Sequence, residues 1–149
     1  MSLDNWHSNG WLLSHQSSRQ EIEDLLAIVN RDLKDCQSPG LSTDWQFNIA
    51  YNALLQAATA ALAAAGYRAS RDSHHYRVLQ SLAFTAGLEE SAVRQLDAFR
   101  KKRNLTGYER VGAVSDREVA EMIQTAIAVG QQVETWIRQS HPELLGEAS

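Results

Sequence analysis

The sequence predicts an all-α protein, a five-helix up-and-down antiparallel bundle, and three observations carry this prediction. Helix-breaking residues are scarce, with two prolines and eight glycines among 149 residues. Apolar residues recur at three- and four-residue spacings in several segments, as on the buried face of a helix. Serine, aspartate and glycine stand where such segments would begin or end. A chain of this length fits one domain that can bury a core without a disulfide or a metal.

The first predicted helix runs from about Ser18 to Cys36, and the pattern of Ser18 and Glu21 is that of a capping box. A second helix follows from cap residues at 42–44 to about Gly66. The alanine-rich stretch 57–65 leaves little side-chain bulk on this helix, so another helix can approach it closely. The second helix is therefore expected to be central in the bundle.

Three further helices complete the prediction. A short one follows the polar connection 67–72 and ends at Gly87, and a fourth begins near Glu89 and carries basic residues at its other end. The fifth opens on a second capping box, Ser115 with Glu118, and stops at Pro142. No strand is predicted. The helical domain is expected to span 18–141, between an N-terminal arm, 1–17, and a C-terminal tail, 142–149.

Charge and cysteine usage narrow the function classes. A formal net charge of −4 argues against generic nucleic-acid binding. Cys36 is the single cysteine and no secretory signal pattern opens the chain, which favours a reducing, cytoplasmic compartment. The longest apolar run, 57–65, is far shorter than the roughly 20 residues of a membrane-spanning helix. The sequence indicates no cofactor and no membrane association.

A local basic patch at the end of the fourth helix is the most informative feature for function. The candidate phosphate-binding residues in it are Arg100, Lys101, Arg103, Asn104 and Arg110. Arginine offers a planar fork of donors and asparagine offers both a donor and an acceptor. If the helix continues beyond Gly107, Asn104 and Tyr108 share one face. The alternative stays open that these cations complement the helix dipole, or that Arg103 pairs with a buried carboxylate.

Two other groups of residues have simpler interpretations. His74 and His75 are adjacent on one helix and point about 100° apart, so they are poor joint metal ligands, and no metal site is predicted.

Trp45, Phe47 and Tyr51 could form a base-stacking strip, but their spacing favours packing in the core or at a dimer interface.

The arrangement resembles the HEPN domains (higher eukaryotes and prokaryotes nucleotide-binding), which are five-helix bundles. The resemblance is carried by the segment 48–55, the Ala-Ala-Ala-Gly-Tyr-Arg segment 63–68, His74-His75 and above all Arg103-Asn104. This last pair is similar to the family's R-N-x-x-x-H motif. In that motif the arginine and the histidine are the catalytic pair of a metal-independent ribonuclease at a dimer interface.

The histidine position of the motif is occupied by Tyr108. An unperturbed tyrosine has a pKa near 10 and is a poor base at neutral pH. The resemblance therefore implies a homodimeric protein associated with RNA or nucleotide, and a role as a toxin–antitoxin component. Arg103 and Tyr108 are then the candidate catalytic residues of a weak or lost ribonuclease. The resemblance also implies a packing or motif-supporting role for the histidines of the third helix. The alternative is a non-catalytic module that partners a nucleotidyltransferase or another protein, and composition alone supports a plain helical bundle.

Overall fold

A computed structural model gives the structure of the chain and describes residues 2–108 and 114–145, with side chains as far as residue 104 in the first range. Most of these residues are helical, which confirms the all-α class. The elements in chain order are α1 (Leu3–Ser8), β1 (Leu12–Ser14), α2 (Arg19–Asp35), α3 (Thr43–Ala64), β2 (Tyr67–Ala69), α4 (His74–Gln80), a 3-10 turn (Ser81–Ala83), α5 (Glu90–Tyr108), α6 (Asp116–Ser140) and α7 (Pro142–Leu145).

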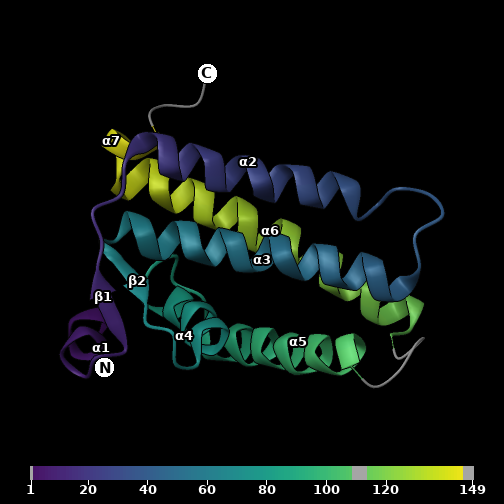
Figure 1. Cartoon of the computed structure of the whole chain (residues 1–149). Helices are drawn as coiled ribbons and strands as arrows, with labels where there is room; N and C mark the ends of the chain where they lie inside the picture. The colour runs from purple at the N-terminus through teal and green to yellow at the C-terminus, as the bar shows by residue number, and fades with distance from the viewer. Residues whose placement is uncertain (1, 109–113, 146–149) are drawn as a thin grey trace.

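Helix α3 is the centre of the molecule. It makes its most extensive contacts with α6 and α2, and α4 and α5 pack against it as well (Figure 1). Its alanines between 57 and 64 are buried, as a central position in the bundle requires. Helices α2 and α5 run in one direction and α3 and α6 in the other (Figure 1). The long helices α2, α3, α5 and α6 therefore alternate in direction along the chain, and α3 and α6, which pack against each other, are parallel.

Serine caps begin the long helices where the sequence predicts them. The Ser42 side chain accepts a hydrogen bond from the amide of Trp45, and Ser115 forms the full reciprocal capping box with Glu118. Ser18 also caps its helix, but Glu21 does not reach back to complete a box, because its carboxylate lies 2.8 Å from the ring of His15. The predicted capping box at the start of α2 is therefore only half formed.

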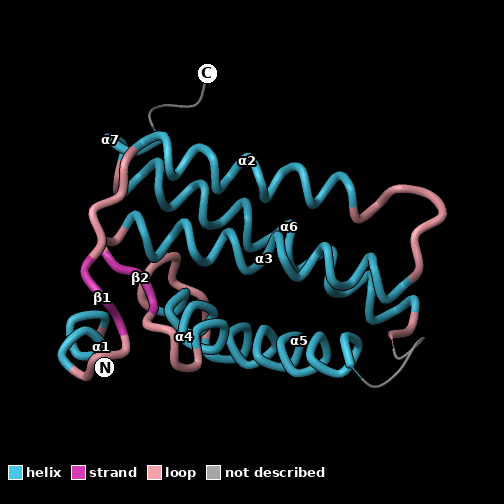
Figure 2. Tube along the Cα trace, in the orientation of Figure 1, coloured by secondary structure: helices cyan, strands magenta, loops and turns pink. Residues whose placement is uncertain are grey.

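A small antiparallel sheet corrects the prediction that the chain has no strand. Leu12 of β1 faces Ala69 of β2, and the sheet joins the N-terminal arm to the segment that follows α3 (Figure 2). Each strand has three residues, which is too short to show an alternating pattern in the sequence. Leu12 is buried, so the arm contributes to the core.

Aromatic contacts attach the rest of the arm. Trp6 of α1 is buried and packs edge-on against Trp11 and Phe84. The guanidinium of Arg77 in α4 lies 3.5 Å from the ring centroid of Trp11. This distance is well within the range of a cation–π interaction. The arm is thus fixed to α4, the helix that carries the two histidines.

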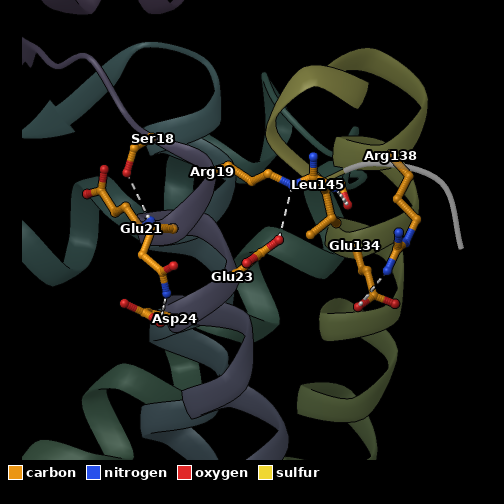
Figure 3. Close-up of polar contacts among 9 residues, drawn as sticks. Ser18, Arg19, Glu21, Glu23, Asp24, Glu134, Arg138 and Leu145 are labelled. Atoms are coloured by element: carbon orange, nitrogen blue, oxygen red, sulfur yellow. Dashed lines mark hydrogen bonds and ion pairs between the residues drawn. The ribbon is translucent and has the colours of Figure 1, made fainter. Parts of the chain in front are cut away.

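The C-terminal turn α7 packs against α2 and α6, where the sequence predicts only a tail. Arg19 of α2 donates to the carbonyl of Leu145 at 3.4 Å and to Glu23 at 3.1 Å, and Figure 3 shows it pointing between the two. Leu145 is buried. Across the described ranges, no helix combines the length and the apolar character that crossing a membrane requires.

Candidate functional site

The basic helix end predicted from the sequence lies on α5, which continues through Gly107 to Tyr108. Because the helix continues beyond Gly107, Asn104 and Tyr108 occupy positions on the same face of α5. The side chain of Tyr108 and all of Arg110 lie outside the described residues, so the roles predicted for them stay predictions. The other candidates, Arg100, Lys101, Arg103 and Asn104, are described with their side chains.

Three of these four candidates open onto one concave surface, which we call the basic hollow. It has a volume of about 610 Å³ and lies between α4 and α5. Its wall includes Ser73, His74 and His75 from the start of α4, and Arg100, Arg103 and Asn104 from the end of α5. Lys101 is exposed and is not part of this wall. The structure thus brings the two sequence features carrying polar groups, the Arg-Asn pair and the His-His pair, to the same place.

Arg100 is held in place by an acidic neighbour on its own helix. Its Nε donates to Asp97 Oδ1 at 2.8 Å, and Lys101 Nζ lies 3.4 Å from the other oxygen of this carboxylate. Burial on its own raises the pKa of Asp97, but the hydrogen bonds and charges of Arg100 and Lys101 outweigh it and hold the pKa below its ordinary value. Asp97 is therefore an anion that orients Arg100, whose Cζ lies 5.4 Å from the ring centroid of Tyr76.

Arg103 is half-buried, and its guanidinium Cζ lies 5.8 Å from the ring centroid of Tyr51 in α3. Tyr51 is a core residue, only 2% exposed. Burial raises its pKa to about 12, although the charges of Arg103 and Arg100 act in the opposite direction. The phenol therefore keeps its proton at neutral pH, and its oxygen lies 3.4 Å from Nδ1 of His75.

His75 completes this part of the site as a neutral imidazole. Burial lowers its pKa, and the positive charges of Arg103 and Arg100 lower it further. When the Tyr51 hydroxyl donates to Nδ1, the proton of the neutral ring is on Nε2. An Nε2–H group is a hydrogen-bond donor, which suits an anion in the basic hollow. The ring contact of His75 with Tyr51 agrees with the packing role predicted for the histidines, and His75 also lines the basic hollow.

Ser73, at the rim of the basic hollow, has a strained backbone. Its φ is 53° and its ψ is 39°, a left-handed conformation that is uncommon for a residue with a side chain. Such conformations cost of order 1 kcal/mol and are concentrated at functional sites. Within the described part of the chain, no three His, Cys, Asp or Glu side chains come together to hold a metal ion.

A second concave surface lies on the other side of Arg103, and we call it the amide hollow. Its volume is about 480 Å³, and its wall includes Asp32 from α2, Trp45, Asn48, Ile49 and Asn52 from α3, and Arg103. Asp32 is 6% exposed, and its carboxylate accepts a 2.7 Å hydrogen bond from Asn52 Nδ2. Arg103 is common to the walls of both hollows.

The sequence interpretation did not identify Asp32 and Asn52, although one signal pointed to the first. Asp32 follows Ile22, Leu26 and Val29 at helical spacing, so it falls on the buried stripe of α2. A carboxylate on such a stripe needs a partner, and here Asn52 and Arg31 supply it. Phe47 and Tyr51 are core residues, in agreement with the packing interpretation, whereas Trp45 is 60% exposed at the amide hollow.

Comparison with known proteins does not add to this description. No protein-family model matches the chain, and neither a curated protein nor a solved structure matches it. The chemistry of the two hollows therefore follows from the side chains that line them. The resemblance to HEPN domains stays a prediction that rests on the motifs given above.

Proposed function

We propose that this chain is a HEPN-like protein that binds phosphate groups of RNA or of a nucleotide in the basic hollow. One observation carries the proposal: Arg100, Arg103 and Asn104 of α5 share an open concave surface with His74 and His75 of α4. Two guanidinium groups, an amide and two imidazoles are the donors that recognise a phosphate.

The electrostatics of the basic hollow favour an anion although the whole chain has a net charge of −4. Asp97 offsets part of the charge of Arg100 and Lys101. Arg103 lies against the phenol of Tyr51, whose high pKa keeps it neutral at pH 7. Arg103 is half-buried and lines both the basic hollow and the neighbouring amide hollow. This position makes Arg103 the principal phosphate-binding residue of the proposal.

Cleavage of RNA is the catalytic form of this proposal, and we expect it to be weak or lost. A metal-independent ribonuclease must remove a proton from the ribose 2′-hydroxyl, and tyrosine, which stands at position 108, is ordinarily a poor base at neutral pH. If the Tyr51 hydroxyl donates to Nδ1 of His75, the imidazole carries its proton on Nε2 and is better suited to holding a phosphate oxygen than to accepting the proton of the 2′-hydroxyl. Binding without rapid cleavage is therefore the expected behaviour.

The homodimer, the toxin–antitoxin role and the nucleotidyltransferase partner are proposals that rest on the family resemblance. The competing proposal is a non-catalytic interaction module. It is favoured by the contacts of Arg100 with Asp97 and of Arg103 with Tyr51, which give both side chains a structural role. The two proposals differ in their affinity for RNA, because the interaction module has none.

Binding of fluorescent single-stranded RNA, measured by polarisation in low salt without metal, tests the proposal. Arg103→Ala is expected to weaken binding by about 10- to 100-fold, because it removes charge-assisted hydrogen bonds. Arg94→Ala is the matched control. Arg94 lies on the same helix, and its side chain is 70% exposed beside Glu90, outside both hollows. The control removes the same charge and is expected to leave the affinity nearly unchanged.

The salt dependence separates a specific contact from general attraction. The logarithm of the binding constant falls linearly with the logarithm of the salt concentration. For single-stranded RNA, each phosphate that the protein neutralises contributes about −0.7 to the slope of this line. Arg103→Ala is expected to make the slope shallower by about this amount and Arg94→Ala to leave it unchanged. Equal effects of the two variants would contradict a built site. No binding to RNA or to nucleotide would favour the interaction module, and cleavage that Arg103→Ala abolishes would show an active ribonuclease.

A further inference from the structure

The amide hollow adjoins the proposed phosphate site and has different chemistry. The walls of both hollows include arginines, but the basic hollow adds two imidazoles, whereas the amide hollow adds an indole, two amides and a carboxylate. Arg103 forms part of both walls, so a ligand atom beside its guanidinium is next to both surfaces. Both volumes fall within the roughly 300–1,000 Å³ that is usual for small-molecule sites.

We propose that the amide hollow binds the nucleobase of the same ligand whose phosphate occupies the basic hollow, and that it prefers guanine. This inference rests on the proposed function, because it places the base relative to the phosphate bound by Arg103. It assigns a chemical identity to the ligand that neither the motif nor the basic hollow supplies. Three features of the amide hollow support it: an exposed ring, a hydrogen-bonding edge and the shared arginine.

The exposed ring is Trp45, in the first turn of α3. Its side chain is 60% exposed although tryptophan usually buries most of its surface. Ile49 lies one helical turn further on and lines the same hollow, so an apolar surface borders the polar groups. A nucleobase stacks on such a ring through its π-face, and this contact does not depend on the identity of the base. Trp45 therefore supplies affinity, and other groups must supply selectivity.

The hydrogen-bonding edge is the carboxylate of Asp32. Oδ2 accepts from Asn52 at 2.7 Å, which fixes the plane of the group, and Oδ1 accepts from Arg31 at 3.0 Å. A carboxylate has about four lone-pair sites, so Oδ2 retains acceptor capacity. The side chain of Arg31 is 62% exposed and that of Asp32 only 8%, so Arg31 can leave Oδ1 when the N–H donors of a ligand take its place. Asp32 thus offers two adjacent acceptor oxygens at the amide hollow.

Guanine matches these acceptors better than adenine does. The Watson–Crick edge of guanine carries two adjacent donors, N1–H and the 2-amino group, which can pair with both oxygens of Asp32. Adenine presents the lone pair of N1 at the corresponding position, which repels a carboxylate. The guanine O6 acceptor can then take a hydrogen bond from an amide N–H, a group that Asn48 carries at the same hollow.

Titration calorimetry of the full chain with guanosine monophosphate, adenosine monophosphate and ribose 5-phosphate tests this inference. We expect the guanine nucleotide to bind about tenfold more tightly than either of the other two. Trp45→Ala is expected to weaken the binding of both nucleotides, because either base stacks on the ring, and to leave the affinity for ribose 5-phosphate unchanged. Trp45→Phe is the matched control and is expected to retain most of the affinity for the nucleotides, because it keeps an aromatic ring.

A second variant tests the edge separately from the ring. Asp32→Asn keeps the size of the side chain and replaces one acceptor oxygen with a donor, so we expect the preference for guanine over adenine to disappear. A thermal melt of each variant confirms that it is folded. Equal binding of all three ligands, unaffected by Trp45→Ala, would overturn the inference and leave the phosphate site standing. A ring-dependent preference for adenine would overturn the assignment of guanine. Failure of all three ligands to bind would overturn the proposed function itself.

Discussion

Replacing Gly130 with alanine should stabilise the protein. Gly130 is buried in the middle of α6 and faces α2, where the methyl group of an alanine would lie 3.4 Å from Cγ1 of Val29 and 4.0 Å from Cδ1 of Leu33. Both distances are ordinary van der Waals contacts. Alanine is favoured over glycine in a helix interior by about 0.5–1 kcal/mol, and burying one methyl group contributes about 0.8 kcal/mol. The expected gain in the free energy of unfolding is therefore about 1.3–1.8 kcal/mol.

Urea unfolding followed by circular dichroism measures this gain, and a thermal melt should show a midpoint about 3–7 °C higher. Gly87→Ala is the matched control. Gly87 has a φ of 77° with open space around it, so the same substitution adds strain there without a clash. We expect it to cost about 1–2 kcal/mol. A decrease in stability in Gly130→Ala would refute the reasoning, because it would mean that α2 and α6 leave no room for a methyl group at this position.

Three further predictions concern a cap, a buried pair and a titrating group. Ser115→Ala should lower the free energy of unfolding by about 1 kcal/mol in urea, because it removes the cap of α6. Asp32→Ala should lower it by about 1–3 kcal/mol, since it leaves the Asn52 amide without its acceptor, whereas Asp35→Ala on the same helix should change it little. Folding lowers the pKa of His75. The contribution of neutral His75 to the free energy of unfolding is therefore complete above about pH 6.5, and it is lost as the pH falls through the pKa that His75 has in the folded protein. His75→Gln should therefore flatten the decline in stability between about pH 7 and pH 5.

Local signals account for the parts of the fold that could be predicted. A serine cap acts within one helical turn, so Ser42 and Ser115 mark the starts of α3 and α6 in the sequence as in the structure. The apolar spacings identify the long helices because each helix buries one face. The same local reasoning predicted a full capping box at Ser18. It failed there because His15, outside the helix, binds the carboxylate of Glu21.

Contacts between distant segments account for what could not be predicted. The strands β1 and β2 are short, and each is stable only because the other lies beside it. The parallel arrangement of α3 and α6 depends on packing across the whole bundle. At the site, the spacing along α5 identified Arg103, but no local signal could show that His75 approaches it from α4 or that Asp32 faces Asn52 from α2.

The polar groups around Arg103 are costly to bury, and this cost is the strongest general argument for a site. A bundle of this kind would accept apolar residues at the positions of Asp32 and Tyr51, which lie on buried faces of α2 and α3. Buried polar and charged groups are weak evidence for stability, because well-packed apolar residues often replace them without a penalty. Here Asp32 lines the amide hollow, and Tyr51 contacts Arg103 and His75, which line the basic hollow. Stability alone does not require this arrangement, whereas recognition of a ligand with a charged part and a hydrogen-bonding ring does.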